Sequence, residues 1–202
     1  MRRLLDYAEE EIARRIREGA KMAVEALSAA LTEEPKAESI RKISSRIHEL
    51  HYEISDLVME AVARYSPVAT DLRFLKGALF VSYDIYRVAR YAYDIAVVVE
   101  KLGSGCWSRR VVEVGEVVKR MVSTSVEMFL NKDISRLKEV EELDDNVVDK
   151  AYESSLVDVL RGADRCKVME TVVLRLLERA SDHAVYIANH AYYLVTGQVK
   201  RH

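Results

Sequence analysis

Two acidic side chains near the end of the chain are spaced so that they could bind one cation. Glu178 and Asp182 stand four residues apart in a stretch with a helical pattern, so both project from one face. A second acidic row, again at steps of four, precedes them: Glu141, Asp145, Asp149 and Glu153. Carboxylate oxygens suit hard cations such as Mg²⁺, Ca²⁺, Mn²⁺ or iron better than a metal that prefers thiolates. The spacing therefore favours a metal site where the two helices lie side by side.

The pattern leaves an alternative open, because the same acids could form a solvated outer face. Residues such as Leu177 and Ala184 mark the core side of the last helix, and the acids fall nearly opposite to them. Like charges four residues apart cost about 0.2–0.5 kcal/mol each in an isolated helix, a cost that salt reduces. The pattern alone does not decide between a metal site and a solvated face.

Further polar residues border the acidic face, and we take four as the periphery of the candidate site: Glu141, Arg175, His183 and Asn189. His183 and His190 are seven residues apart, so neither has the partner histidine at four-residue spacing that a helical zinc site requires. Each histidine is more typical of a core boundary, hydrogen-bonded to a neighbouring helix. Because His183 follows Asp182 directly, a peripheral role at the metal site stays open.

The elements that would position these residues are helices. Apolar residues recur at helical spacing in six stretches: 3–31, 37–65, 67–102, 108–130, 133–161 and 164–196. We expect Pro67 in the first turn of the third helix and Asp133 as the N-cap of the fifth. Gly197 is suited to the left-handed residue that follows the last helix. The sequence predicts an all-α protein.

The chain divides near its middle, where GSGC at 103–106 is the one cluster of small, flexible residues. Sliding the chain by 92 residues places IYRVARYAYDIA (85–96) on LERASDHAVYIA (177–188). We therefore predict two tandem repeats of three helices each, residues 1–103 and 104–202.

Composition excludes several other classes of protein. Half of the 202 residues are hydrophobic, and 2 prolines and 7 glycines are too few for the turns of an all-β fold. A net charge of −2 argues against nucleic-acid binding. Two cysteines, Cys106 and Cys166, are too few for a disulfide framework or a thiolate zinc site. Without a signal peptide, a 20-residue apolar run or a phosphate loop, we expect a cytoplasmic protein that is no enzyme.

Two segments resemble the signatures of the PhoU family of phosphate-uptake regulators: PVATDLR at 67–73, with Asp71 and Arg73, and LERASDHAVYIA at 177–188, with Arg179. The resemblance implies a duplicated three-helix bundle in which E-x-x-x-D pairs hold metal ions. In this chain that pair is Glu178 and Asp182, with Asp145 and Asp149 as counterparts on the preceding helix. The implied cofactor is a metal ion such as iron, zinc or magnesium.

The first half departs from the family pattern. Tyr86 and Arg90 stand where the repeat expects Glu and Asp, and Leu57 replaces one of the acids on the preceding helix, although Glu53 remains. A guanidinium at position 90 would repel a cation and could pair with Glu53 or Asp94. We therefore predict that the first metal site is absent or rebuilt.

The resemblance also implies a function. It points to a cytoplasmic, non-enzymatic regulator that contacts the ATPase subunit of a phosphate ABC transporter, its sensor histidine kinase, or both. We expect a homodimer that binds no nucleic acid and reaches the membrane only through these partners. Two alternatives stay open: an accessory subunit of an ion channel or other transporter, and an enzyme with a carboxylate-bridged dimetal core.

Overall fold

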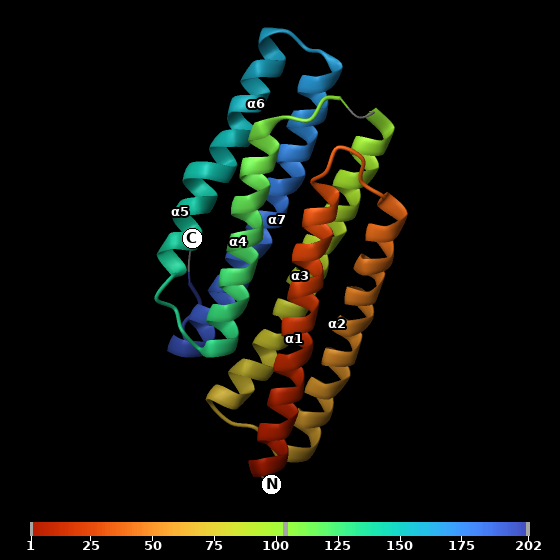
Figure 1. Ribbon diagram of the computed structural model, residues 1–202. Coiled ribbons are helices and arrows are strands. Elements are labelled where there is room, and N and C mark those ends of the chain that lie inside the picture. The colour runs from red at the N-terminus through yellow and green to blue at the C-terminus, as the bar shows by residue number, and fades with distance from the viewer. Residues whose placement is uncertain (1, 103–104, 201–202) are drawn as a thin grey trace.

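The computed structural model describes residues 2–102 and 105–200, and every regular element in those ranges is a helix. Figure 1 shows two groups side by side. The first group comprises α1 (Arg2–Ala30), α2 (Ala37–Tyr65) and α3 (Thr70–Leu102). The second comprises α4 (Arg109–Asn131), α7 (Arg165–Thr196) and a fifth helix made of α5 (Leu137–Leu143), a π-helical turn η1 (Asp144–Val148) and α6 (Asp149–Arg161). The all-α fold with two three-helix bundles is confirmed, whereas the predicted boundary at 103/104 lies outside the described residues.

The helices form because apolar residues recur along one face of each. In α1, for example, Ile12, Ile16, Ala23 and Leu27 are fully buried. Ser108 caps α4 by accepting a hydrogen bond from the Val111 N–H at 3.2 Å. These local signals agree with the helical pattern of the sequence.

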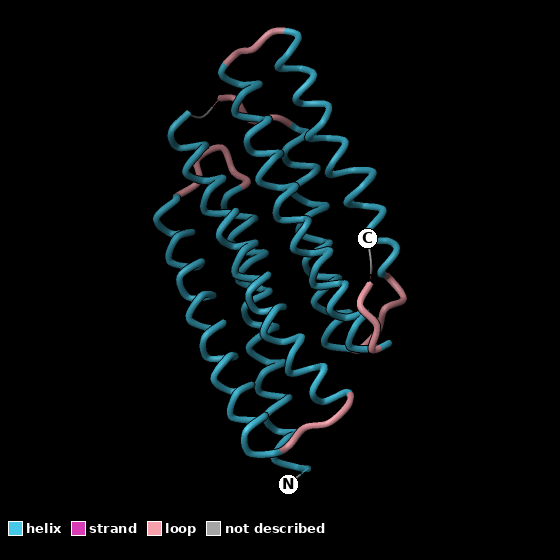
Figure 2. The backbone as a smooth tube through the Cα atoms, turned by 180° about the vertical axis from the view of Figure 1, so that it is seen from behind, coloured by secondary structure: helices cyan, strands magenta, loops and turns pink. Residues whose placement is uncertain are grey.

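The two bundles meet along α3 and α7, which make the most extensive contact of any pair of helices. The two helices run antiparallel, because Asp84 of α3 contacts His183 of α7 while Arg73, near the start of α3, reaches the end of α7. Figure 2 shows this side-by-side arrangement from behind. The seam therefore joins the closing helix of one repeat to that of the other.

Two predicted helix starts were wrong, and in each case a turn takes the place of the first helical residues. The third helix begins at Thr70 rather than Pro67, because Ser66 and Ala69 adopt positive φ of 48° and 47°. The fifth begins at Leu137, so Asp133 does not cap it but accepts a hydrogen bond from the Ser135 N–H at 2.9 Å. By contrast, Gly197 ends α7 with φ of 72°, as predicted.

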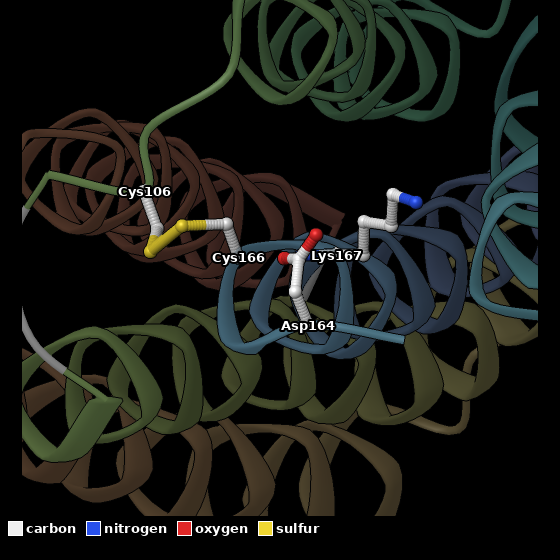
Figure 3. Close-up of a disulfide and its surroundings, with 4 residues drawn as sticks. All are labelled: Cys106, Asp164, Cys166 and Lys167. Carbon is white, nitrogen blue, oxygen red and sulfur yellow. A yellow bond between two sulfur atoms is a disulfide. The ribbon is translucent and has the colours of Figure 1, made fainter. Parts of the chain in front are cut away.

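The two cysteines, whose pairing was not predicted, form a disulfide. Cys106 lies in the segment before α4, and Cys166 lies in the first turn of α7, where Asp164 is the N-cap (Figure 3). The bond closes a loop of 60 residues and is largely buried, with Cys106 6% exposed. The disulfide thus ties the entry of the second repeat to its last helix.

Candidate metal centre

Acidic side chains gather where the fifth helix packs against α7. Asp144, Asp145 and Asp149 each offer a carboxylate oxygen within 4.8 Å of the others. Burial raises the pKa of both Asp144 and Asp149, and the negative charge of Asp182 on α7 raises it further. Burial raises the pKa of Glu178, and the negative charges of Asp182 and Asp149 raise it further. The group of oxygens within 4.8 Å of one another thus contains two of the four residues predicted as metal ligands, Asp145 and Asp149, while Glu178 and Asp182 lie near it on α7 and their role stays a prediction.

A π-helical turn shapes the fifth-helix side of this group. The Asp149 N–H donates to the Asp144 carbonyl, five residues back rather than four. Residues five apart therefore stand above one another, and Asp144 faces the same side as Asp149. Turns of this kind occur often at functional sites. Asp144 was not predicted, because acids counted in steps of four do not include it; the adjacent pair Asp144–Asp145 was the available signal.

Asp145 is exposed, but Asp144, Asp149, Glu178 and Asp182 are partly buried rather than spread over a solvated outer face. The side chains of Glu178 and Asp182 are only 14% and 24% exposed. Burial, followed by neighbouring negative charges, raises the pKa of Glu178, and burial raises the pKa of Asp144 to about 6. In addition, Asp144 Oδ1 and Glu178 Oε2 are buried without a hydrogen-bond partner in the described part of the protein. Such unpartnered oxygens are rare and suit a site that accepts a cation.

Two arginines of α7 partly compensate these charges. Arg175 Nη1 donates to Glu178 Oε1 at 2.5 Å, and Arg179 Nη1 donates to Asp182 Oδ2 at 2.8 Å. Each guanidinium thus occupies one oxygen of a predicted ligand. A cation that binds these carboxylates must compete with both ion pairs.

The predicted periphery is only partly at the site. Arg175 contacts the acids, and Glu141, one turn before Asp145, pairs with Lys200. Asn189 instead lines a cleft of about 220 Å³ with Lys76 and His190.

His183, considered for the periphery of the metal site, contacts the other bundle instead. This histidine points into the seam, where its Nδ1 lies 2.8 Å from Asp84 Oδ1. His190 Nε2 lies 3.7 Å from the second oxygen of Asp84, which is only 5% exposed. His183 is therefore hydrogen-bonded across the α3–α7 seam, as predicted for a boundary histidine, and His190 lies near the same carboxylate without a hydrogen bond to it. The sequence offered no signal for the buried Asp84.

The family-motif residues Asp71 and Arg73 hold the start of α3. Asp71 is 8% exposed and accepts hydrogen bonds from the guanidinium of Arg2 in α1. Arg73 donates to the Leu194 carbonyl at 3.0 Å and to the Thr70 hydroxyl at 3.0 Å. The Arg2–Asp71 and Arg73–Leu194 contacts link separate helices, and neither involves the acidic group.

The corresponding positions of the first repeat hold rings and ion pairs. Tyr86 stacks on His48 with ring centroids 4.3 Å apart. Glu53 pairs with Arg15 at 3.1 Å and with Arg46 at 2.8 Å. Arg90 pairs with Asp94 at 3.2 Å, which confirms one of the two partners predicted for it. These contacts agree with the prediction that the first metal site is absent or rebuilt, which stays a prediction.

Comparisons with known proteins all point to one protein family. A family model described as "PhoU domain" matches residues 9–99 and again residues 111–191. The chain is 28% identical over 197 residues to "Phosphate-specific transport system accessory protein PhoU homolog 1" of Methanothermobacter thermautotrophicus, covering 93% of this chain and 89% of that protein. A PhoU homolog of Pseudomonas aeruginosa is 30% identical over 178 residues, covering 82% of this chain and 72% of the homolog.

Solved structures show the same fold. The crystal structure of PhoU from Pseudomonas aeruginosa has a TM-score of 0.84 at 23% identity, covering 96% of this chain and 99% of that one. The phosphate transport system regulatory protein PhoU from Streptococcus pneumoniae has a TM-score of 0.86 at 18% identity, covering 98% of this chain and 100% of that one. At these identities the likeness concerns the fold alone.

Proposed function

Because the chain belongs to the PhoU family, we propose that it regulates phosphate uptake through contact with a phosphate ABC transporter. The observation that carries this proposal is the match of the family model to both repeats. Relatives over most of its length are named as accessory proteins of phosphate-specific transport, and such proteins are regulatory rather than enzymes. The expectation that the chain is not an enzyme agrees with those names.

The contact we propose is made from the cytoplasmic side, to the transporter's ATPase subunit, its sensor histidine kinase, or both, by a homodimer. Among the helices of residues 2–102 and 105–200, none combines the length and apolar character that a bilayer crossing requires. A rigid bundle of long helices suits a docking partner, because it presents side chains on fixed surfaces. Regulation would then depend on which surfaces the partners recognise.

We also propose that the acidic group binds metal. Its ligands would be Asp145, Asp149, Glu178 and Asp182, and Asp144 is added because its buried oxygen has no partner. An all-oxygen donor set favours iron or magnesium over zinc, which prefers nitrogen and sulfur ligands. A bound cation would neutralise crowded carboxylates and would crosslink the fifth helix to α7. The metal is thus a structural and electrostatic part of the regulator.

The transporter proposal can be tested by affinity purification of the full chain from its own cells grown with abundant phosphate. We expect the phosphate-transporter ATPase subunit or its kinase to be recovered, and deletion of the gene to relieve repression of phosphate uptake. Recovery of an ion-channel subunit instead would favour the alternative function. Unchanged phosphate uptake in the deletion strain would contradict the proposal.

The metal proposal can be tested by elemental analysis of the purified protein after dialysis. We expect Glu178→Gln and Asp182→Asn to lose the bound metal. Glu113→Gln is the matched control, because Glu113 lies on α4 and pairs with Arg109 in solvent. Equal metal content in all variants, or none in the wild type loaded with iron or magnesium, would show that the acids hold no metal.

A further inference from the structure

The outer side of α6 carries apolar side chains that its own bundle leaves uncovered. Leu156, Val157 and Leu160 are 40%, 44% and 86% exposed. Leu160 follows Leu156 by four residues and Val157 by three, so the three side chains share one side of the helix, which we call the outer face. Figure 1 shows α6 at the edge of the molecule. Exposed apolar residues gathered on one face are typical of an interaction surface, whereas single ones are ordinary.

The remaining sides of α6 face its own bundle. From α4, Arg110 donates to Asp158 Oδ2 at 2.9 Å and to the Ser154 hydroxyl at 3.2 Å. From α7, the Thr171 hydroxyl donates to the Ser155 carbonyl at 3.3 Å, and Ser155 is the one residue of α6 that is fully buried. These contacts fix how α6 is rotated, because they hold the sides that face α4 and α7. The outer face is left for a partner outside the bundle.

The end of the outer face toward the start of α6 is acidic. Between residues 144 and 153 the fifth helix holds four acids and one cation, Lys150. Glu153, the acid next to the apolar side chains, is exposed and forms no ion pair within 4.0 Å among the described residues. The two acids of α7 nearby, Glu178 and Asp182, are each paired with an arginine, so they add little net charge. Without metal, this end is therefore negative.

The opposite end, where the chain turns from α6 into α7, is basic. Residues 161–167 hold three cations and one acid. Arg161 and Arg165 are exposed, and neither pairs with a carboxylate within 4.0 Å in the described part of the chain. The acid, Asp164, is engaged as the N-cap of α7, where it accepts a hydrogen bond from the Lys167 N–H at 2.9 Å. The outer face thus runs from negative charge through apolar side chains to positive charge.

We propose that the outer face of α6 binds the same face of a second copy of this chain, with the two α6 helices antiparallel about a two-fold axis. In that arrangement the apolar side chains of one copy pack against those of the other. Each acidic end then meets the other copy's basic end, and Glu153 of one copy lies opposite Arg161 of the other. A two-fold interface must be self-complementary, and this order of charges is. The inference rests on the homodimer of the proposed function and assigns the surface that forms it.

The test is sedimentation equilibrium of the full chain between about 1 and 100 μM, in EDTA so that the acidic end stays free of metal. We expect a monomer–dimer equilibrium. Leu160→Asp should weaken the dimer at least about tenfold, because it removes an apolar contact and places a carboxylate in the interface. Met59→Asp is the matched control: Met59 is an apolar residue of α2 that is 63% exposed, so dimer affinity should change less than about twofold. Thermal unfolding of each variant verifies that it is folded.

A charge exchange tests the antiparallel pairing. Arg161→Glu and Glu153→Arg should each weaken the dimer about fivefold or more, because each sets like charges opposite one another. The double variant Arg161→Glu/Glu153→Arg restores opposite charges across the axis, so its affinity should return to within about threefold of the wild type. A double variant that dimerises no more tightly than the single variants would overturn the antiparallel pairing.

The remaining outcomes separate this inference from the proposed function. A wild type that is monomeric at about 100 μM overturns the inference, as do oligomers larger than a dimer, which a two-fold contact cannot form. A dimer that Leu160→Asp weakens no more than Met59→Asp also overturns it, although the homodimer itself then stands. If the chain is monomeric and Leu160→Asp abolishes recovery of the transporter ATPase subunit in affinity purification, that partner and not a second copy occupies the outer face. Transporter contact is measured with the wild type, so it can fail without affecting the dimer.

Discussion

Breaking the Cys106–Cys166 disulfide should lower the stability of the protein mainly by freeing the unfolded chain. The bond closes a loop of 60 residues. Loop-closure entropy for that length is about 14 cal/mol/K, or about 4 kcal/mol at 25 °C. Unfolding entropy of about 2.1 cal/mol/K per residue, over 202 residues, converts this into a melting temperature about 10 °C lower.

The native state should change little on reduction, because other contacts hold the same ends together. Ser108 donates to Glu170 Oε1 of α7 at 2.7 Å. Arg110 donates to the same oxygen at 2.8 Å and to Asp158 at 2.9 Å. The start of α4 therefore stays in contact with α6 and α7 without the disulfide. Reduction should thus change the free energy of unfolding mainly by changing the unfolded state.

The assay is urea unfolding of the wild type with and without a reductant, with the double variant Cys106→Ser/Cys166→Ser as control. We expect reduction to lower the midpoint and to raise the slope of free energy against urea, because the reduced unfolded chain exposes more surface. The urea unfolding curve of the double variant should match that of the reduced wild type and should not change when the reductant is added. Superimposable wild-type curves, or two free thiols in the oxidised protein by mass spectrometry, would refute this account.

Three further changes probe the acidic group, the core and the seam. Burial raises the pKa of Asp144 to about 6 from 3.8, so the metal-free fold loses stability as pH rises between these values. Allowing for its partial exposure, Asp144→Asn should stabilise the metal-free protein by about 1 kcal/mol at pH 7 and hardly at pH 4, measured by urea unfolding. Gly77→Ala should cost about 1–3 kcal/mol, because its Cβ would lie 2.6 Å from the buried Phe129 ring; a change below measurement error would show that the ring moves freely. Asp84→Asn should cost about 1–3 kcal/mol in urea unfolding, because it weakens the buried hydrogen bond to His183, and an unchanged midpoint would contradict that bond.

Much of the fold was predictable because its signals are local. The helical spacing of apolar residues, the end of α7 at Gly197 and the break near the middle of the chain all depend on neighbours within a few residues. The wrongly predicted helix starts at Pro67 and Asp133 show the limit of such signals, because both residues are also favourable in the turns that they occupy.

The candidate site was predictable only in part. Steps of four identified Glu178 and Asp182, because residues so spaced share a helix face whatever the helix packs against. Asp144 escaped that count, because the π-helical turn that aims it at α7 departs from the regular period.

The sequence by itself determined which residues form helices, which faces are apolar and which acids share a face, since backbone geometry converts spacing directly into direction. Tertiary structure alone decided which faces meet. Only the packing of α3 on α7 buries Asp84 beside His183 and brings Arg73 to the carbonyl of Leu194. It also places Cys106 against Cys166 across a loop of 60 residues. Contacts of this kind join residues far apart in the chain, so the spacing of residues within one helix cannot predict them.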